Sequence, residues 1–141
     1  MSLVRRLTVL QNEAGNTPVP SRKYFHIGQS ETIEEVGECV PMVALVDDNL
    51  SRFIVSDAAS HRWGRPEVLL HSLPNLDVKS GDGVFLLAAA GEDRTEAHPE
   101  GKGRMHFIHL GLARPIAERG ITKLYVYRLD GVQVHGLRSK A

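Results

Sequence analysis

The feature that most constrains this chain is a series of short β-prone runs, each ended by turn-forming residues. β-branched and aromatic residues suit a pleated sheet, whereas Gly, Pro, Asn and Asp interrupt one. About seven or eight such runs occur, and no long helical pattern accompanies them. This spacing predicts an all-β sandwich or barrel. The expected strands are Arg6–Leu10, Lys23–Ile27, Val40–Val46, Ser51–Ser56, Val84–Ala90, Arg104–Leu112, Lys123–Arg128 and Val132–Leu137.

Two pairs of these runs indicate hairpins. Lys123–Arg128 and Val132–Leu137 flank an Asp-Gly dipeptide, which supplies the positive φ values that tight hairpins require. Val40–Val46 and Ser51–Ser56 flank the polar turn residues 47–49, which predicts a second hairpin.

Helical structure is expected only in short turns. Pro115–Gly120 has proline at its start and glycine at its end, as a single helical turn does. Pro66–Leu70 fits either a short helix or a loop followed by an edge strand, and Ser30–Glu38 fits either a helical turn or a strand. Gly91–Gly103 is rich in charge and glycine, which is typical of a solvated loop.

The overall composition limits both domain count and function class. A chain of 141 residues with 42% hydrophobic residues is expected to form one domain, residues 1–141. Equal numbers of acidic and basic residues, 17 each, disfavour an extended basic groove for nucleic acid. No apolar run is long enough for a membrane-spanning helix. Met1–Leu10 lacks the features of a secretory signal, so the cytoplasm is the default expectation.

Cys39 is the single cysteine, so neither an intramolecular disulfide nor a multi-thiolate zinc site is expected. Its apolar neighbours predict a buried thiol of raised pKa and low reactivity rather than a nucleophile.

One stretch of the sequence resembles a known family. Asn49–Trp63 (NLSRFIVSDAASHRW) is similar to the D-L-S-G-W-x-L-x-D-x-x-G-H-x-[WYF] pattern of lamin-tail-like domains. Leu76–Leu87 takes the place of that family's L-x-P-G-x-x-V-x-V, and Gly91–Thr95 takes that of its Gly-x-Asp-Thr loop. Ile121–His135 resembles the closing G-D-x-x-x-L-x-D-x-x-G-x-V-V-D hairpin.

The resemblance covers about residues 40–138 and departs from the family at several positions. Phe53 stands where the family has tryptophan, and Arg52 stands where it has glycine. The resemblance implies an immunoglobulin-like β-sandwich with an interaction role, and it transfers no catalytic residue.

Seven histidines raise the question of a metal site. His106 and His109 are three residues apart, which on a strand places them on opposite faces. No His-x-His, no H-E-x-x-H and no histidine close to Cys39 occurs, so neither a metal nor another cofactor is expected. The alternative from another class is a small hydrolase or metal-dependent enzyme assembled from distant residues, namely His61, His106, His109 and Asp57.

Two surfaces are candidates for binding. Arg62, Trp63 and Arg65 are close in sequence, and the predicted hairpin would bring Arg52 near them. An aromatic ring flanked by arginines can stack a base or a sugar and hold an anion. The simpler interpretation, which we favour, is that the tryptophan caps the core while the arginines reach water. The second candidate is the pair Tyr125 and Tyr127, which share one face of the last hairpin and fit either a partner surface or the core.

The function expected is that of a non-catalytic binding or assembly module. A protein partner or a second copy of the chain is the first expectation, followed by nucleic acid or polysaccharide. A self-assembling structural protein is a further alternative, because zero net charge removes one barrier to self-association.

Overall fold

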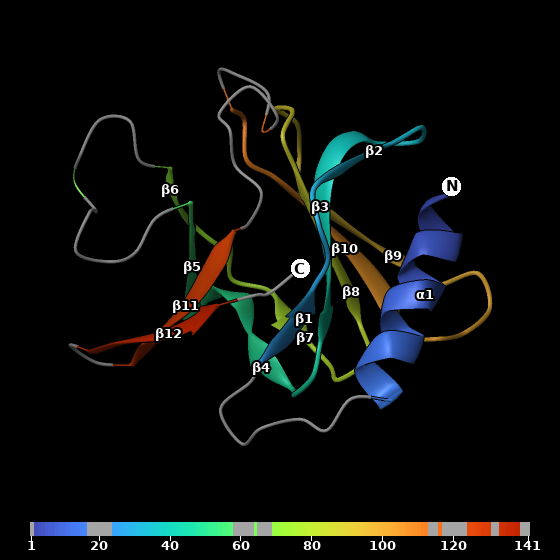
Figure 1. The fold of residues 1–141 in the computed structure, drawn as a ribbon, viewed down its shortest axis with the longest axis horizontal. Helices are drawn as coiled ribbons and strands as arrows, with labels where there is room; N and C mark the ends of the chain where they lie inside the picture. The colour runs from blue at the N-terminus through green and yellow to red at the C-terminus, as the bar shows by residue number, and fades with distance from the viewer. Residues whose placement is uncertain are drawn as a thin grey trace.

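The computed structural model of the 141-residue chain describes residues 2–16, 24–57, 64, 69–112, 116, 124–130 and 133–138. These residues form two packed sheets, and a helix covers the outer face of the larger sheet (Figure 1). The protein is therefore mostly β-structure, as the sequence predicts.

The larger sheet has six strands in the order β1-β3-β8-β10-β9, with β2 also paired to β3. All pairs are antiparallel except β8 with β10, which run parallel. Its strands are β1 Phe25–Ile27, β2 Glu31–Ile33, β3 Gly37–Ala44, β8 Gly83–Leu87, β9 Arg94–Ala97 and β10 Arg104–His109.

The smaller sheet has four antiparallel strands in the order β12-β11-β5-β6. They are β5 Phe53–Ser56, β6 Leu70–Ser72, β11 Tyr125–Asp130 and β12 Gln133–Arg138. β4 Asp48–Asn49 pairs with β7 Asp77–Val78 in a short two-stranded sheet. β4 leads directly into the 3-10 turn η1 Leu50–Arg52.

Central strands of the larger sheet are buried on both faces, which explains their nearly continuous apolar sequences. In β8, Val84 and Leu86 point into the core between the sheets, whereas Phe85 and Leu87 point toward the helix. In β3, Met42 belongs to the core between the two sheets, whereas Cys39 belongs to the apolar cluster between the larger sheet and the helix. The burial predicted for Cys39 is confirmed.

The prediction of a strand at Arg6–Leu10 is wrong, because these residues belong to the helix α1 Leu3–Asn16. Leu3, Leu7 and Leu10 recur at helical spacing and form one buried stripe against the sheet. Gly83 makes room for this contact, since a Cβ atom there would lie 2.7 Å from Leu7 Cδ1. Tertiary packing thus overrides the local β preference of this segment. The expectation of only one or two short helical turns is corrected by the same finding.

The hairpin predicted between Val40–Val46 and Ser51–Ser56 is also wrong. β3 pairs with β1, β2 and β8 in the larger sheet, whereas β5 pairs with β6 and β11 in the smaller one. The polar residues 47–49 lie in the connection that takes the chain from the larger sheet to the smaller one. Asp48 and Asn49 pair with β7 instead of closing a tight turn.

Other local expectations have mixed outcomes. The final hairpin is confirmed, with Asp130 opposite Gln133. The ambiguous segment 30–38 contains β2 and the start of β3, joined by a turn at residues 34–36. Gly37, the first residue of β3, has a φ of 78° as the chain leaves this turn. The predicted loop Gly91–Gly103 contains the strand β9. Most of Pro115–Gly120 and of Pro66–Leu70 lies outside the described residues, although Leu70 begins β6.

Candidate functional site

The sequence-predicted residue Arg52 lies at the end of η1, and its side chain is 58% exposed. Its Nη1 donates to Asp48 Oδ1 at 3.3 Å. The other oxygen of Asp48 accepts from Arg128 Nε, also at 3.3 Å. One carboxylate therefore bridges two guanidinium groups.

Arg62, Trp63 and Arg65 lie outside the described residues, as does His61. Their predicted grouping with Arg52 therefore remains a prediction.

Tyr125 and Tyr127 lie on the face of β11 opposite to the core residue Val126. Their rings stack with centroids 6.0 Å apart and an interplanar angle of 28°. Tyr127 is only 6% exposed, and Tyr125 is half-buried. The accessible part of this pair is therefore mainly Tyr125.

Of the histidines in the enzyme hypothesis, the structure describes His106 and His109. His106 and His109 both lie on β10, three residues apart, and contact different acids. His106 Nε2 is 2.9 Å from Asp82, whereas His109 Nδ1 is 3.5 Å from Asp93. Asp57 Oδ1 accepts from the Leu69 backbone N–H. In the part of the chain that the structure describes, no three His, Cys, Asp or Glu side chains are arranged to hold a metal ion.

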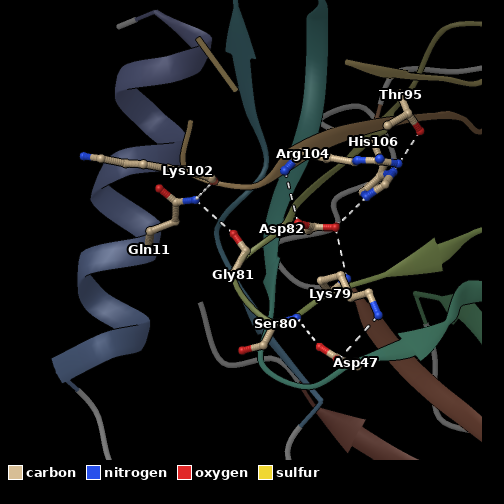
Figure 2. Close-up of polar contacts among 10 residues, drawn as sticks. All are labelled: Gln11, Asp47, Lys79, Ser80, Gly81, Asp82, Thr95, Lys102, Arg104 and His106. Atoms are coloured by element: carbon tan, nitrogen blue, oxygen red, sulfur yellow. Dashed lines mark hydrogen bonds and ion pairs between the residues drawn. The ribbon is translucent and has the colours of Figure 1, made fainter. Parts of the chain in front are cut away.

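A buried polar network that sequence reasoning missed lies at one end of the larger sheet (Figure 2). Asp82 precedes β8 and is 3% exposed. Its Oδ2 accepts from His106 Nε2 at 2.9 Å and from the Lys79 backbone N–H at 3.0 Å. Its Oδ1 accepts from the Arg104 backbone N–H at 3.1 Å. Asp82 therefore joins the turn before β8 to the start of β10.

The network continues to the edge of the sheet, because Thr95 Oγ1 lies 2.9 Å from His106 Nδ1. A carboxylate only accepts hydrogen bonds, so His106 Nε2 carries a proton. In the neutral imidazole Nδ1 is then an acceptor, and the Thr95 hydroxyl donates to it. Thr95 is exposed, whereas His106 is fully buried. This chain of hydrogen bonds holds the edge strand β9 against β10 and β8.

Gly103 packs directly against this network. Its φ is 85°, and a Cβ atom there would lie 2.8 Å from Asp82 Oδ1. Glycine is required here because its φ is positive, and because any side chain would collide with the Asp82 carboxylate. On the other side of Asp82, Gln11 Nε2 of α1 donates to the carbonyl oxygens of Gly81 and Lys102 (Figure 2). A recess of about 360 Å³ lies here, lined by Gln11, Asn12, Ser80, Gly81, Lys102 and Gly103.

β9 is the last strand of the larger sheet, and all four of its residues are exposed. The direction of its backbone groups follows from the ladder with β10. His98 N–H donates to Gly103 C=O, and Ala97 pairs with Arg104. Since hydrogen-bonded pairs alternate in an antiparallel ladder, the backbone groups of Glu96 and Arg94 point toward β10. Those of Thr95 and Ala97 therefore point outward.

The side chains of β9 divide between the two faces of the sheet. Arg94 and Glu96 share the face that α1 covers, and Arg94 Nε lies 2.6 Å from Glu96 Oε2. The Arg94 guanidinium lies over the ring of Phe107, 4.2 Å from its centroid. Thr95 lies on the other face, over His106. This charged, extended and open edge is the main structural feature that the loop prediction for Gly91–Gly103 missed.

Comparisons with known proteins give no relative. No family model matches the chain, no curated protein matches it, and no solved structure matches it. Among the described residues, no helix has the length and apolar character needed to cross a membrane. The site must therefore be interpreted from its own geometry.

Proposed function

We propose that this domain is a non-catalytic binding or assembly module that takes up an extended segment of polypeptide along β9. The observation that carries the proposal is the edge itself, where the exposed residues Thr95 and Ala97 direct their backbone N–H and C=O groups outward. An added strand can pair with such groups, which supply affinity while neighbouring side chains supply selectivity.

The rigidity of β9 supports this proposal. An edge strand that frays would lose the ordering on which strand addition depends. Here the hydrogen bonds from Thr95 through His106 to Asp82 fix the middle of β9 from within the protein. The cation–π contact of Arg94 with Phe107 fixes it from the opposite face.

Two of the other edge strands, β6 and β1, are less suited to this role. β6 has three residues and exposes Leu70, and β1 has three residues and lies beside α1. His26 of β1 also contacts Glu13 of the helix at 3.1 Å. Charged side chains at an edge discourage indiscriminate pairing. The Arg94–Glu96 pair therefore favours a partner of matching charge over general association.

We also propose that the sandwich is of the immunoglobulin-like type implied by the resemblance to lamin-tail domains. Two face-packed, mainly antiparallel sheets support it. The helix α1 and the parallel pair β8–β10 are additions that the quoted motifs do not include. Zero net charge favours a protein partner over nucleic acid.

The substitution Ala97→Pro tests the binding proposal. It removes an outward N–H while leaving the Glu96 and His98 bonds to β10 in place. We expect the wild-type protein to bind a subset of an array of seven-residue peptides of strand-forming sequence, and the variant to lose that binding by at least about tenfold. Hydrogen exchange should show new protection at the Thr95 and Ala97 amides in the complex.

Ser72→Pro is the matched control. Leu73 N–H donates to Phe53 C=O, so the Ser72 N–H points outward from β6 at the edge of the other sheet. This variant should keep the peptide binding. Equal binding by the Ala97→Pro variant, or protection of amides away from β9, would refute the proposal.

A further inference from the structure

We infer that the strand taken up at this edge is β9 of a second copy of the chain, paired antiparallel in a register centred on Thr95. This inference rests on the proposed function, because it requires the same open edge. It adds the identity of the partner and the register. Two copies paired in this way would join their larger sheets into one continuous sheet.

Charge selects the register. When two identical strands pair about a two-fold axis at Thr95, Arg94 of each copy lies opposite Glu96 of the other. A two-fold axis at Glu96 would instead place two glutamates opposite each other, and one at Arg94 would place two arginines opposite each other. Like charges directly opposite destabilise a strand pair. The sequence Arg-Thr-Glu is therefore self-complementary only about its threonine.

Backbone geometry agrees with the same centre. The outward groups of β9 belong to Thr95 and Ala97, so Thr95 can form the hydrogen-bonded pair at the two-fold axis. Arg94 and Glu96 then occupy non-hydrogen-bonded pairs, in which the Cα atoms of facing residues come within about 4.5 Å. This close position suits an ion pair between the two copies.

The side chains need little rearrangement. Within one copy, Arg94 and Glu96 are already paired at 2.6 Å and are 47% and 49% exposed. Dimerisation exchanges the two contacts within the copies, one in each, for two equivalent contacts between them. Exposed ion pairs contribute little net stability, so the charges choose the register while the backbone ladder supplies the association.

The expected dimer is weak. A four-residue edge buries less surface than the roughly 1,000 Å² of a stable interface. We therefore expect a concentration-dependent equilibrium with a dissociation constant on the order of 100 µM. Zero net charge means that no overall repulsion opposes it.

A charge-swap experiment tests the inference on the full chain by sedimentation velocity over a concentration series. Arg94→Glu and Glu96→Arg each place like charges opposite one another in a homodimer, and each should weaken self-association at least about tenfold. In an equimolar mixture of the two variants, a heterodimer places the two glutamates of one copy opposite the two arginines of the other. The mixture should form a heterodimer that recovers most of the wild-type affinity, short only of what the Arg94→Glu copy loses with its Phe107 contact.

Arg5→Glu is the matched control, because Arg5 is an exposed residue of α1 and its reversal changes the net charge as Arg94→Glu does. It should dimerise like the wild type. Thermal unfolding establishes that each variant is folded, and the restored heterodimer itself excludes misfolding as the cause of the losses.

Each other outcome overturns the inference. A wild-type protein that stays monomeric near 1 mM, well above the expected dissociation constant, has no such dimer. Single variants that dimerise like the wild type, or a mixture that does not restore association, place the contact elsewhere. If the protein is monomeric but β9 still binds array peptides, only the identity of the partner is wrong. If β9 binds neither, the proposed function fails as well.

Discussion

At the scale of single residues, Asp82 contributes more to this fold than its sequence context indicates. Within Gly81-Asp82-Gly83 it has the sequence context of a turn residue, and its backbone N–H does close a turn by donating to Lys79 C=O. Its side chain is nevertheless buried and satisfies three donors, two from backbone N–H groups and one from His106. Spatial neighbours 22 and 24 residues away determine this role, so the local sequence could not reveal it.

We therefore expect Asp82→Ala to destabilise the protein by about 3 kcal/mol, because it leaves buried donors without an acceptor. Urea unfolding measures this loss. Asp47→Ala is the control, since Asp47 is 64% exposed although it also accepts from a backbone N–H, that of Ser80. It should cost less than about 1 kcal/mol. Similar losses in the two variants would contradict a structural role for the Asp82 network.

At the scale of elements, the sequence predicts strands where apolar runs are long and fails where tertiary contacts decide. β3, β8 and β10 were predictable because burial on both faces leaves them rich in apolar and β-branched residues, despite the two histidines of β10. α1 was missed because Val4, Thr8 and Val9 have β-branched side chains, although Leu3, Leu7 and Leu10 carry the helical period. β9 was missed because an edge strand exposed on all its residues has the composition of a loop.

The packing of α1 predicts a clear difference between its two faces. Leu7 is fully buried against the sheet, so Leu7→Ala should lower the free energy of unfolding by about 3 kcal/mol. Asn12 is exposed on the same helix, and Asn12→Ala should change stability by less than about 0.5 kcal/mol. Chemical denaturation followed by far-UV circular dichroism provides both values. Equal effects would show that the helix is not docked through its leucine stripe.

At the scale of the whole molecule, the candidate site depends on how separate segments meet. The edge, the Asp82 network and the recess beside Gln11 are built from α1, the turn before β8, and the β9–β10 hairpin. Their candidate residues are scattered along the sequence without a motif. The sequence did predict candidates at Arg52, Tyr125 and Tyr127, but those lie near or on the smaller sheet. The location of the edge follows only from the strand order, which no local pattern in the sequence carries.

The packing of α1 on the larger sheet also determines how the stability of the protein responds to alkaline pH, through the buried thiol of Cys39. Cys39 lies between α1 and the larger sheet, where burial raises its pKa from 9.0 to about 12, with a further contribution from the negative charge of Glu31. The unfolded chain therefore releases this proton at lower pH than the folded protein does. The stabilising effect is complete below pH 9 and is lost as pH rises toward 12.

Above pH 9 this one group should lower the free energy of unfolding by about 1.4 kcal/mol per pH unit. Other groups also titrate in this range, so the useful quantity is the difference between the wild type and Cys39→Ala, measured by urea unfolding at several pH values. The wild type should lose stability more steeply than the variant between pH 9 and 11. Parallel curves would mean that solvent reaches the thiol in the folded state, and that α1 does not seal the sheet beneath it.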